Sequence, residues 1–374
     1  MKTALVITFD RLRLHDCGCY GNTAGLTPAL DRFACDAVVF DCCYAENTQE
    51  HAVGHAWWSG RYQFLKSPDE QQTERDVLAE TLRTQNIESS LIGESSAESV
   101  VPFPMSFGTT LTIPEADDTP QNASATFEKI LEAAFRVWRH QRESNVERNL
   151  LWLKLNGQSD HANSGENRTQ QMRDIDGMLG TLLNTVQSEL REEDGLFIVI
   201  TAGQGAPPDG SRLPANFQLL GEEVAHVPLL MFATDGEAGI RSSELVQAVD
   251  LFPTLLDWFG CLPETDANCE GCSLLPIVRG EVEKLCKDGE RDILCLGDGR
   301  RAMAIRTRED YTFAMPEAVD NAPEPWEASE DSSSVMRFLK PDDVFEVMDV
   351  ASHDLETTTE RLLQLKKFVG EREN

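Results

Sequence analysis

The residues best placed to do chemistry stand at the end of the first apolar run. Ala4–Ile7 is a short, continuous apolar segment, and Thr8, Phe9 and Asp10 follow it before a loop rich in Gly, Cys and His. Such a run is typical of a strand buried on both faces of a parallel sheet, where ligands bind outside the carboxyl ends. We therefore expect Asp10 to lie at the site. The neighbouring Arg11 adds a fixed positive charge, which disfavours a divalent cation there.

A second group of residues combines one carboxylate with two imidazoles. Glu50, His51 and His55 fall in a stretch that we expect to be helical, so the two histidines would share one face. Together with Asp10 they could bind a transition metal such as Zn²⁺. Alternatively, the histidines are ordinary polar residues near a helix start, and Gly54 weakens the helix. Both interpretations stay open.

The cysteines offer a weaker metal or redox signal. The chain has 10 of them, and Cys269 and Cys272 form a single CxxC without a second CxxC or a paired His motif. A zinc or redox role is one interpretation of this pair. We take reduced structural thiols as the default, because a chain of this size without a secretory signal has little use for disulfides.

Charge limits the classes of partner. The 374 residues include 33 Lys and Arg against 64 Asp and Glu, a formal net charge of −31. Such a field disfavours nucleic acid and anionic membranes, although it also serves simply to keep a surface soluble. No apolar run approaches the roughly 20 residues that span a bilayer, and the apolar start is too short for a signal peptide. We expect a cytoplasmic protein with an unidentified small-molecule or protein ligand; its oligomeric state stays open.

The elements that must position these residues alternate between strands and helices. Leu196–Thr201 is the clearest central strand, and the alternation predicts an α/β fold with a doubly wound, mostly parallel sheet. We expect a main domain over residues 1–289 and a small C-terminal antiparallel α+β subdomain over 290–374. The predicted subdomain has a closing helix near 356–369 and four strands near residues 293–296, 302–306, 311–315 and 344–348.

Several segments, taken in order, resemble the sulfatase family of the alkaline-phosphatase superfamily. The matching segments are Leu5–Asp10 with the loop Gly18–Gly21, Thr27–Phe33, Tyr44-Ala45, Ser59–Tyr62, Val249–Asp257, Ser273–Pro276 and Lys340–Asp343. The resemblance covers nearly the whole chain and implies the sulfatase fold. It also implies a site with a Ca²⁺ or similar hard cation, a Cys- or Ser-derived nucleophile and cationic side chains around the ester.

At the positions that the resemblance assigns to this site, most residue types have changed. The nucleophile falls on Glu50, and the Arg of its motif falls on Gly54. A Lys falls on Glu94 and a His on Ser96. Of the family's other site positions, Asp10 and His161 keep a usable type, whereas the remaining ones fall on Arg11, Gly203-Gln204 and, more loosely aligned, Phe217.

These changes together predict a pocket that repels anions. Glu94 in place of Lys and Gly54 in place of Arg shift the local charge by about three units, and each like-charge contact at about 4 Å opposes an anion by roughly 4 kcal/mol. We therefore expect a non-catalytic binding or regulatory pseudoenzyme without a cofactor. The alternative is a divergent hydrolase of sulfuric or phosphoric esters. It would use Ca²⁺ if the family site persists, or Zn²⁺ in a site rebuilt from Glu50, His51 and His55.

Overall fold

The structure is a computed structural model centred on an eight-stranded sheet. It describes residues 1–48, 50–63, 77–95, 107–114, 120–157, 165–206, 213–262, 269–285, 293–297, 302–320 and 334–371. The strand order is β4-β3-β5-β1-β6-β7-β2-β8. The bounds are β1 Lys2–Arg11, β2 Val38–Tyr44, β3 Glu88–Ser95, β4 Thr109–Pro114, β5 Arg148–Gly157, β6 Gly195–Gln204, β7 Leu229–Ala233 and β8 Ile240–Gln247.

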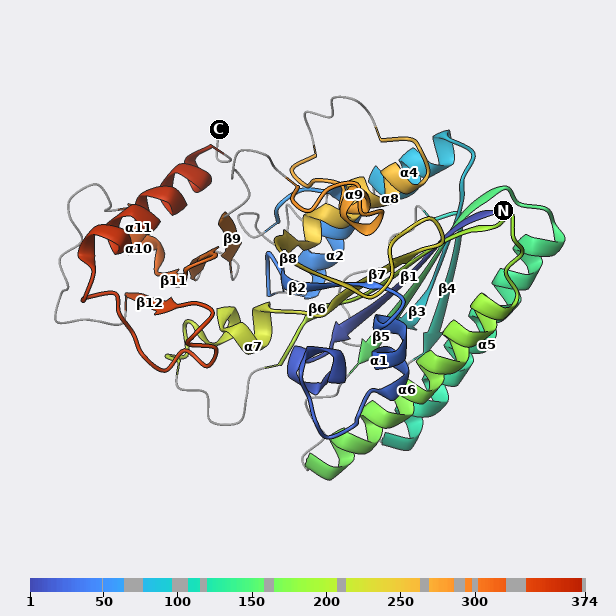
Figure 1. The fold of residues 1–374 in the computed structure, drawn as a ribbon, viewed down its shortest axis with the longest axis horizontal. Coiled ribbons are helices and arrows are strands. Elements are labelled where there is room, and N and C mark those ends of the chain that lie inside the picture. Colours follow the sequence, from blue (N-terminus) through green and yellow to red (C-terminus); the bar gives the residue numbers. More distant parts are fainter. Residues whose placement is uncertain are drawn as a thin grey trace.

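The sheet confirms the predicted mostly parallel architecture. Strand β1 lies between β5 and β6 and runs parallel to both, whereas β7 is antiparallel to its neighbours β6 and β2. The four residues Ala4–Ile7 have no exposed surface, as expected for a central strand covered on both faces. The carboxyl ends of the parallel strands point toward the side of the molecule that holds the C-terminal sheet (Figure 1).

Helices cover both faces of this sheet, as Figure 1 shows. One layer holds α1 Pro28–Ala34, α5 Pro120–Glu143 and α6 Gly165–Ser188, and the other holds α2 Glu50–Ser59, α4 Val77–Thr84, α8 Leu251–Trp258 and α9 Leu275–Val278. Short turns of helix connect the strands: η1 Leu14–Asp16, η2 Gly18–Tyr20, η3 Gln218–Leu220, α7 Glu222–Ala225 and η4 Ala248–Asp250. Within the described ranges, no helix combines the length and the apolar content that a membrane crossing requires.

The C-terminal unit is a separate four-stranded antiparallel sheet, ordered β12-β11-β10-β9. Its elements are β9 Ile293–Gly297, β10 Met303–Thr307, β11 Asp310–Ala314, α10 Pro316–Asp320, β12 Val335–Leu339 and α11 Leu355–Gly370. Leu362 and Leu365 of α11 are buried among residues of this sheet. The predicted antiparallel sheet with a closing helix is thus confirmed, while the domain boundary at residues 289 and 290 stays a prediction.

The predicted strand at residues 344–348 is wrong. The fourth strand is β12, which pairs with β11 from Asp310↔Leu339 to Ala314↔Val335. Residues 344–348 form irregular structure instead, with Val344, Phe345, Val347 and Met348 all exposed. The run is as apolar as a buried strand, but it pairs with none of the described strands, so composition alone misassigned it.

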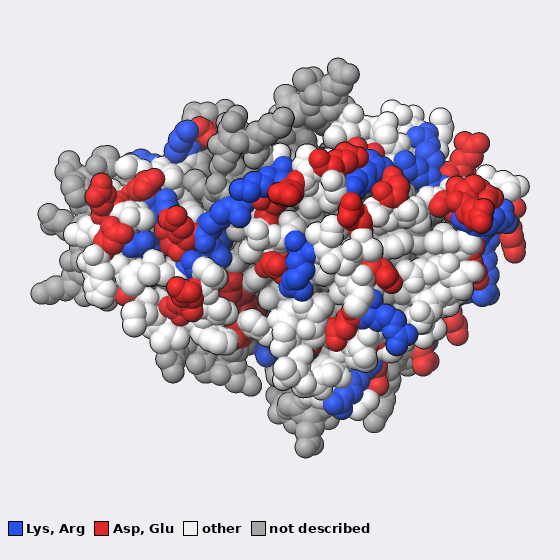
Figure 2. Space-filling model, viewed as in Figure 1, with Lys and Arg blue, Asp and Glu red and all other residues white. Residues whose placement is uncertain are grey.

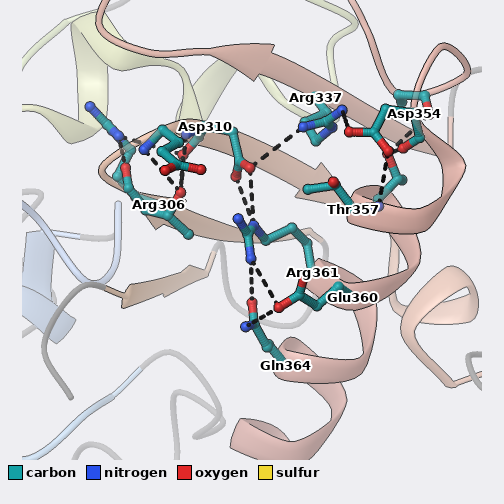
Figure 3. A network of polar contacts seen from close by, with 12 residues as sticks. Arg306, Asp310, Arg337, Asp354, Thr357, Glu360, Arg361 and Gln364 are labelled. Carbon is teal, nitrogen blue, oxygen red and sulfur yellow. Dashed lines mark hydrogen bonds and ion pairs between the residues drawn. The ribbon is translucent and has the colours of Figure 1, made fainter. Parts of the chain in front are cut away.

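A buried ionic network joins α11 to the C-terminal sheet (Figure 3). Asp310 is 1% exposed, and both of its carboxylate oxygens accept from Arg361 Nε at 3.0 Å. Arg337 lies 3.5 Å from the same carboxylate and donates to Asp354 at 3.0 Å. Asp354 in turn caps the first turn of α11 by accepting from the amide of Thr357 at 3.1 Å. Asp310 therefore neutralises two guanidinium groups that have little access to water.

Replacing this carboxylate should destabilise the protein strongly. We expect Asp310→Asn to lower the free energy of unfolding by about 3–5 kcal/mol, because it leaves buried guanidinium groups short of a counter-charge. Urea unfolding followed by circular dichroism measures the change. The matched control is Glu360→Gln: its carboxylate lies 3.7 Å from Arg361 and its side chain is 60% exposed, so the expected loss is about 1 kcal/mol or less. Equal losses in the two variants would contradict this role for Asp310.

Candidate functional site

The predicted site residue Asp10 lies at the carboxyl end of the central strand, where an ammonium group neutralises it. Asp10 is 6% exposed. Lys154 of β5 donates from Nζ to Asp10 Oδ2 at 3.0 Å. Lys154 is in register with Thr8, and alternation along β1 places Thr8 and Asp10 on the same face of the sheet. Pairing of β1 with β5 therefore brings the two charges together.

Arg11 and Gln204 form a second contact at the same edge. These residues are in register on β1 and β6. With the amide of Gln204 oriented to satisfy its neighbours, its oxygen accepts from Arg11 Nε at 3.1 Å and its nitrogen donates to the carbonyl of Thr48 at 2.7 Å. Arg11 and Gln204, which the resemblance aligns with family metal ligands, thus tie two strands to the segment that leads into α2.

Gly203 leaves no side chain at another position that the resemblance assigns to a metal ligand. A Cβ atom at Gly203 would lie 3.2 Å from the carbonyl oxygen of Asp10 and 3.7 Å from Cη2 of Trp57. The indole of Trp57 is 4% exposed, so the space beside Gly203 is already occupied. Gly205 also has no room for a side chain, because a Cβ atom there would stand 2.0 Å from the carbonyl oxygen of Glu223.

An aromatic layer fills the region between α2 and the sheet. The ring centroid of Trp152 lies 6.0 Å from that of Trp57 and 5.8 Å from that of Trp58, and Phe107 packs edge-on against Trp58. His55, which we considered as a zinc ligand, makes an edge contact with Trp58 at 6.4 Å between centroids. This contact favours packing as the role of His55.

The other predicted site residues lie in helix α2, in strand β3 or outside the described residues. Glu50, His51 and Gly54 lie in helix α2, which confirms the helix, but the side chains of Glu50 and His51 fall outside the described part of the chain. Glu94 is half-buried on β3, one residue beyond Gly93, which pairs with Lys154. Ser96 and His161 fall outside the described residues.

Phe217, the residue that the resemblance loosely aligns with a Lys, belongs to the core. Phe217 has no exposed surface, and its ring stacks on Phe313 with the centroids 5.6 Å apart. A charged side chain could not be accommodated there without rebuilding the contact between the two sheets.

The described residues do not fit the hard cation that the fold family implies. Ca²⁺ requires six to eight oxygen ligands in a site without competing positive charge. Here Asp10 already pairs with Lys154, and Arg11 brings a second cation to the same edge. Across the described ranges, no group of three or more His, Cys, Asp or Glu residues is arranged to hold a metal ion.

Lys154 is the site residue that sequence reasoning missed, and it changes the electrostatics that we expected. The floor of the site contains two cations, Lys154 and Arg11, against the carboxylate of Asp10. The expected repulsion of anions therefore does not hold for these three residues. A signal was present, because Lys154 is the one charged residue in the otherwise apolar run Leu150–Leu155.

Comparisons with known proteins agree with the fold. Residues 112–261 match the family model described as Sulfatase. A stretch of 57 residues is 47% identical to arylsulfatase K of Homo sapiens and covers 15% of this chain but only 10% of that protein. The matched stretch thus spans about a tenth of that relative's length.

Solved structures match over nearly the whole chain at low identity. A 2-O GAG sulfatase superposes with a TM-score of 0.74 at 15% identity, covering 100% of this chain and 92% of that one. A protein of a glycosaminoglycan-metabolism locus of Bacteroides thetaiotaomicron gives a TM-score of 0.70 at 13% identity, covering 99% of each chain. The phosphonate monoester hydrolase of Agrobacterium radiobacter gives 0.67 at 13%, covering 99% and 95%. The chain therefore matches the sulfatase family model over residues 112–261 and shares the fold of these solved structures over nearly its whole length.

Proposed function

We propose that this chain is a non-catalytic binding protein built on the sulfatase fold. The ion pair between Lys154 and Asp10, at 3.0 Å, supports this most directly. The carboxylate that a sulfatase would offer to a divalent cation is here neutralised by a side chain of the neighbouring strand. Binding a cation at Asp10 would require breaking this pair and approaching Arg11, and each like-charge contact near 4 Å costs roughly 4 kcal/mol.

The nucleophile position supports the same proposal. Glu50 is the first residue of α2 and stands where the family places a Cys or Ser. A carboxylate there cannot become the modified nucleophile of the family mechanism, and Gly54 provides no guanidinium to hold the ester. Of the positions that the resemblance assigns to attack, metal binding and charge stabilisation, most are thus altered, while the core that shapes the fold is kept.

A divergent ester hydrolase with a rebuilt metal site is the second candidate. Helix α2 forms over Glu50–Ser59, so His51 and His55 stand one turn apart, a spacing that suits a zinc pair. The packing of His55 against Trp58 argues against this candidate. Its substrates would be sulfuric or phosphoric esters.

Metal content and turnover separate the two candidates. After dialysis against Ca²⁺ or Zn²⁺, we expect elemental analysis to find no stoichiometric metal on the purified chain, because the strand-end cations exclude it. We also expect no hydrolysis of 4-nitrophenyl sulfate or 4-nitrophenyl phosphate. Stoichiometric zinc that is lost in the His51→Ala, His55→Ala double variant, together with turnover, would establish the hydrolase instead.

A double-mutant cycle tests the ion pair itself. We expect Asp10→Asn and Lys154→Met each to lower the free energy of unfolding, because each leaves a shielded partner without its counter-charge. The double variant should lose less than the sum of the two, with a coupling energy of about 0.5–3 kcal/mol. Thermal unfolding with and without Ca²⁺ completes the experiment. A coupling energy of zero, or a wild-type protein that Ca²⁺ stabilises, would refute the proposed role of Lys154.

A further inference from the structure

A short loop of the C-terminal unit places apolar side chains in solvent. This apolar loop, residues 343–348, follows the last strand of the small sheet. The exposed fractions of its side chains are 66% for Phe345, 57% for Val347 and 67% for Met348, and Val344 is exposed at 37%. Single exposed apolar residues are ordinary, but a contiguous group of large ones marks an interaction site.

Hydrogen bonds hold the apolar loop in one conformation. The carboxylate of Asp343 accepts from the amide of Val347 at 2.9 Å and from that of Met348 at 2.8 Å. Lys340 Nζ donates to the carbonyl of Asp343 at 2.8 Å. These contacts close the loop on itself and fix the directions of its side chains, which lowers the entropy lost when a partner binds.

Glu346 anchors the middle of the loop to the main domain. It is 8% exposed, and its backbone has a φ of 53°, so its side chain turns inward while its neighbours face solvent. Its Oε1 accepts from the amide of Glu222 in α7 at 2.8 Å. Burial raises the pKa of Glu346 to about 8, so the carboxyl is largely protonated at neutral pH and its burial costs less than that of a charge.

Charge selects among the partners that such a loop could bind. Besides the buried Glu346, the segment Asp342–Asp349 contains three Asp residues and no Lys or Arg. With a net charge of −31, the chain repels a second copy of itself and attracts a basic surface. Among the described residues, Phe345 makes a ring contact with His15 of the main domain, at 6.1 Å between centroids.

We propose that the apolar loop docks a partner polypeptide that combines apolar side chains with Lys and Arg, such as one face of a basic amphipathic helix. Phe345 and Met348 provide the apolar anchors, and the carboxylates of the same segment select a cationic partner. This docking does not depend on whether the strand-end site is catalytic, because the loop lies on a different element and has its own supporting contacts.

A designed pair of peptides tests the proposal on the full chain. The probe is an amphipathic helix of Leu and Lys, and its counterpart has Glu in place of Lys. We expect the Leu/Lys peptide to bind in fluorescence anisotropy at physiological salt. The Phe345→Ser, Met348→Ser double variant should lose affinity by about tenfold or more, as for anchor residues at an interface. Both substitutions leave the charge unchanged, so they do not alter non-specific attraction.

The control is Leu363→Ser, which removes an equally neutral apolar side chain, 42% exposed, from α11. It should keep the affinity of the wild type, and all variants should keep its unfolding transition. Equal binding of the peptide by the wild type and the double variant would show that it binds by non-specific charge attraction. This result would overturn the proposal. So would a dimer in sedimentation analysis that the double variant dissociates, because the occupant would then be a second copy of the chain.

Discussion

The strand-end site depends on how one carboxylate is neutralised. Asp10 lies at the carboxyl end of the central strand with 6% of its surface exposed, so water alone cannot compensate its charge. In the sulfatase family, a divalent ion neutralises the carboxylate at this strand end. Here β5 brings Lys154 to the carboxylate at 3.0 Å, and the counter-charge is part of the chain itself. This ion pair therefore forms as soon as the two strands pair.

The core of the fold does not depend on which group neutralises Asp10. Trp57, Trp58 and Trp152 fill the layer between α2 and the sheet, and Trp57 occupies the space beside Gly203. The stability of the fold comes from these buried rings and from the apolar strands, neither of which needs a metal or a nucleophile. A fold held by such a core can be kept at 13–15% identity to solved structures of this fold.

The sequence predicts the architecture better than the site. The apolar runs of β1, β5 and β6 are unambiguous because each is covered on both faces. Strand β8 has no such run: it buries Ser242 and Glu244, and Arg308 stabilises Glu244 through an ion pair at 2.8 Å that only the tertiary structure provides. Lys154 was missed for a related reason. Its role follows from the register between two strands that lie far apart in the sequence, and no local pattern contains that register.

The strand-end site and the apolar loop are joined by a continuous series of contacts. The amide of Gly205, next to Gln204 at the end of β6, donates to the carbonyl of Val224 in α7 at 2.8 Å. Glu222 of the same helix contacts Lys340 at 3.0 Å and donates from its amide to Glu346. The main sheet thereby positions the loop through the buried ion pair of Lys340 with Glu222 and the hydrogen bond from Glu222 to Glu346. The contacts that run from the end of β6 through α7 thus also fix the exposed apolar loop, whether or not the strand end is catalytic.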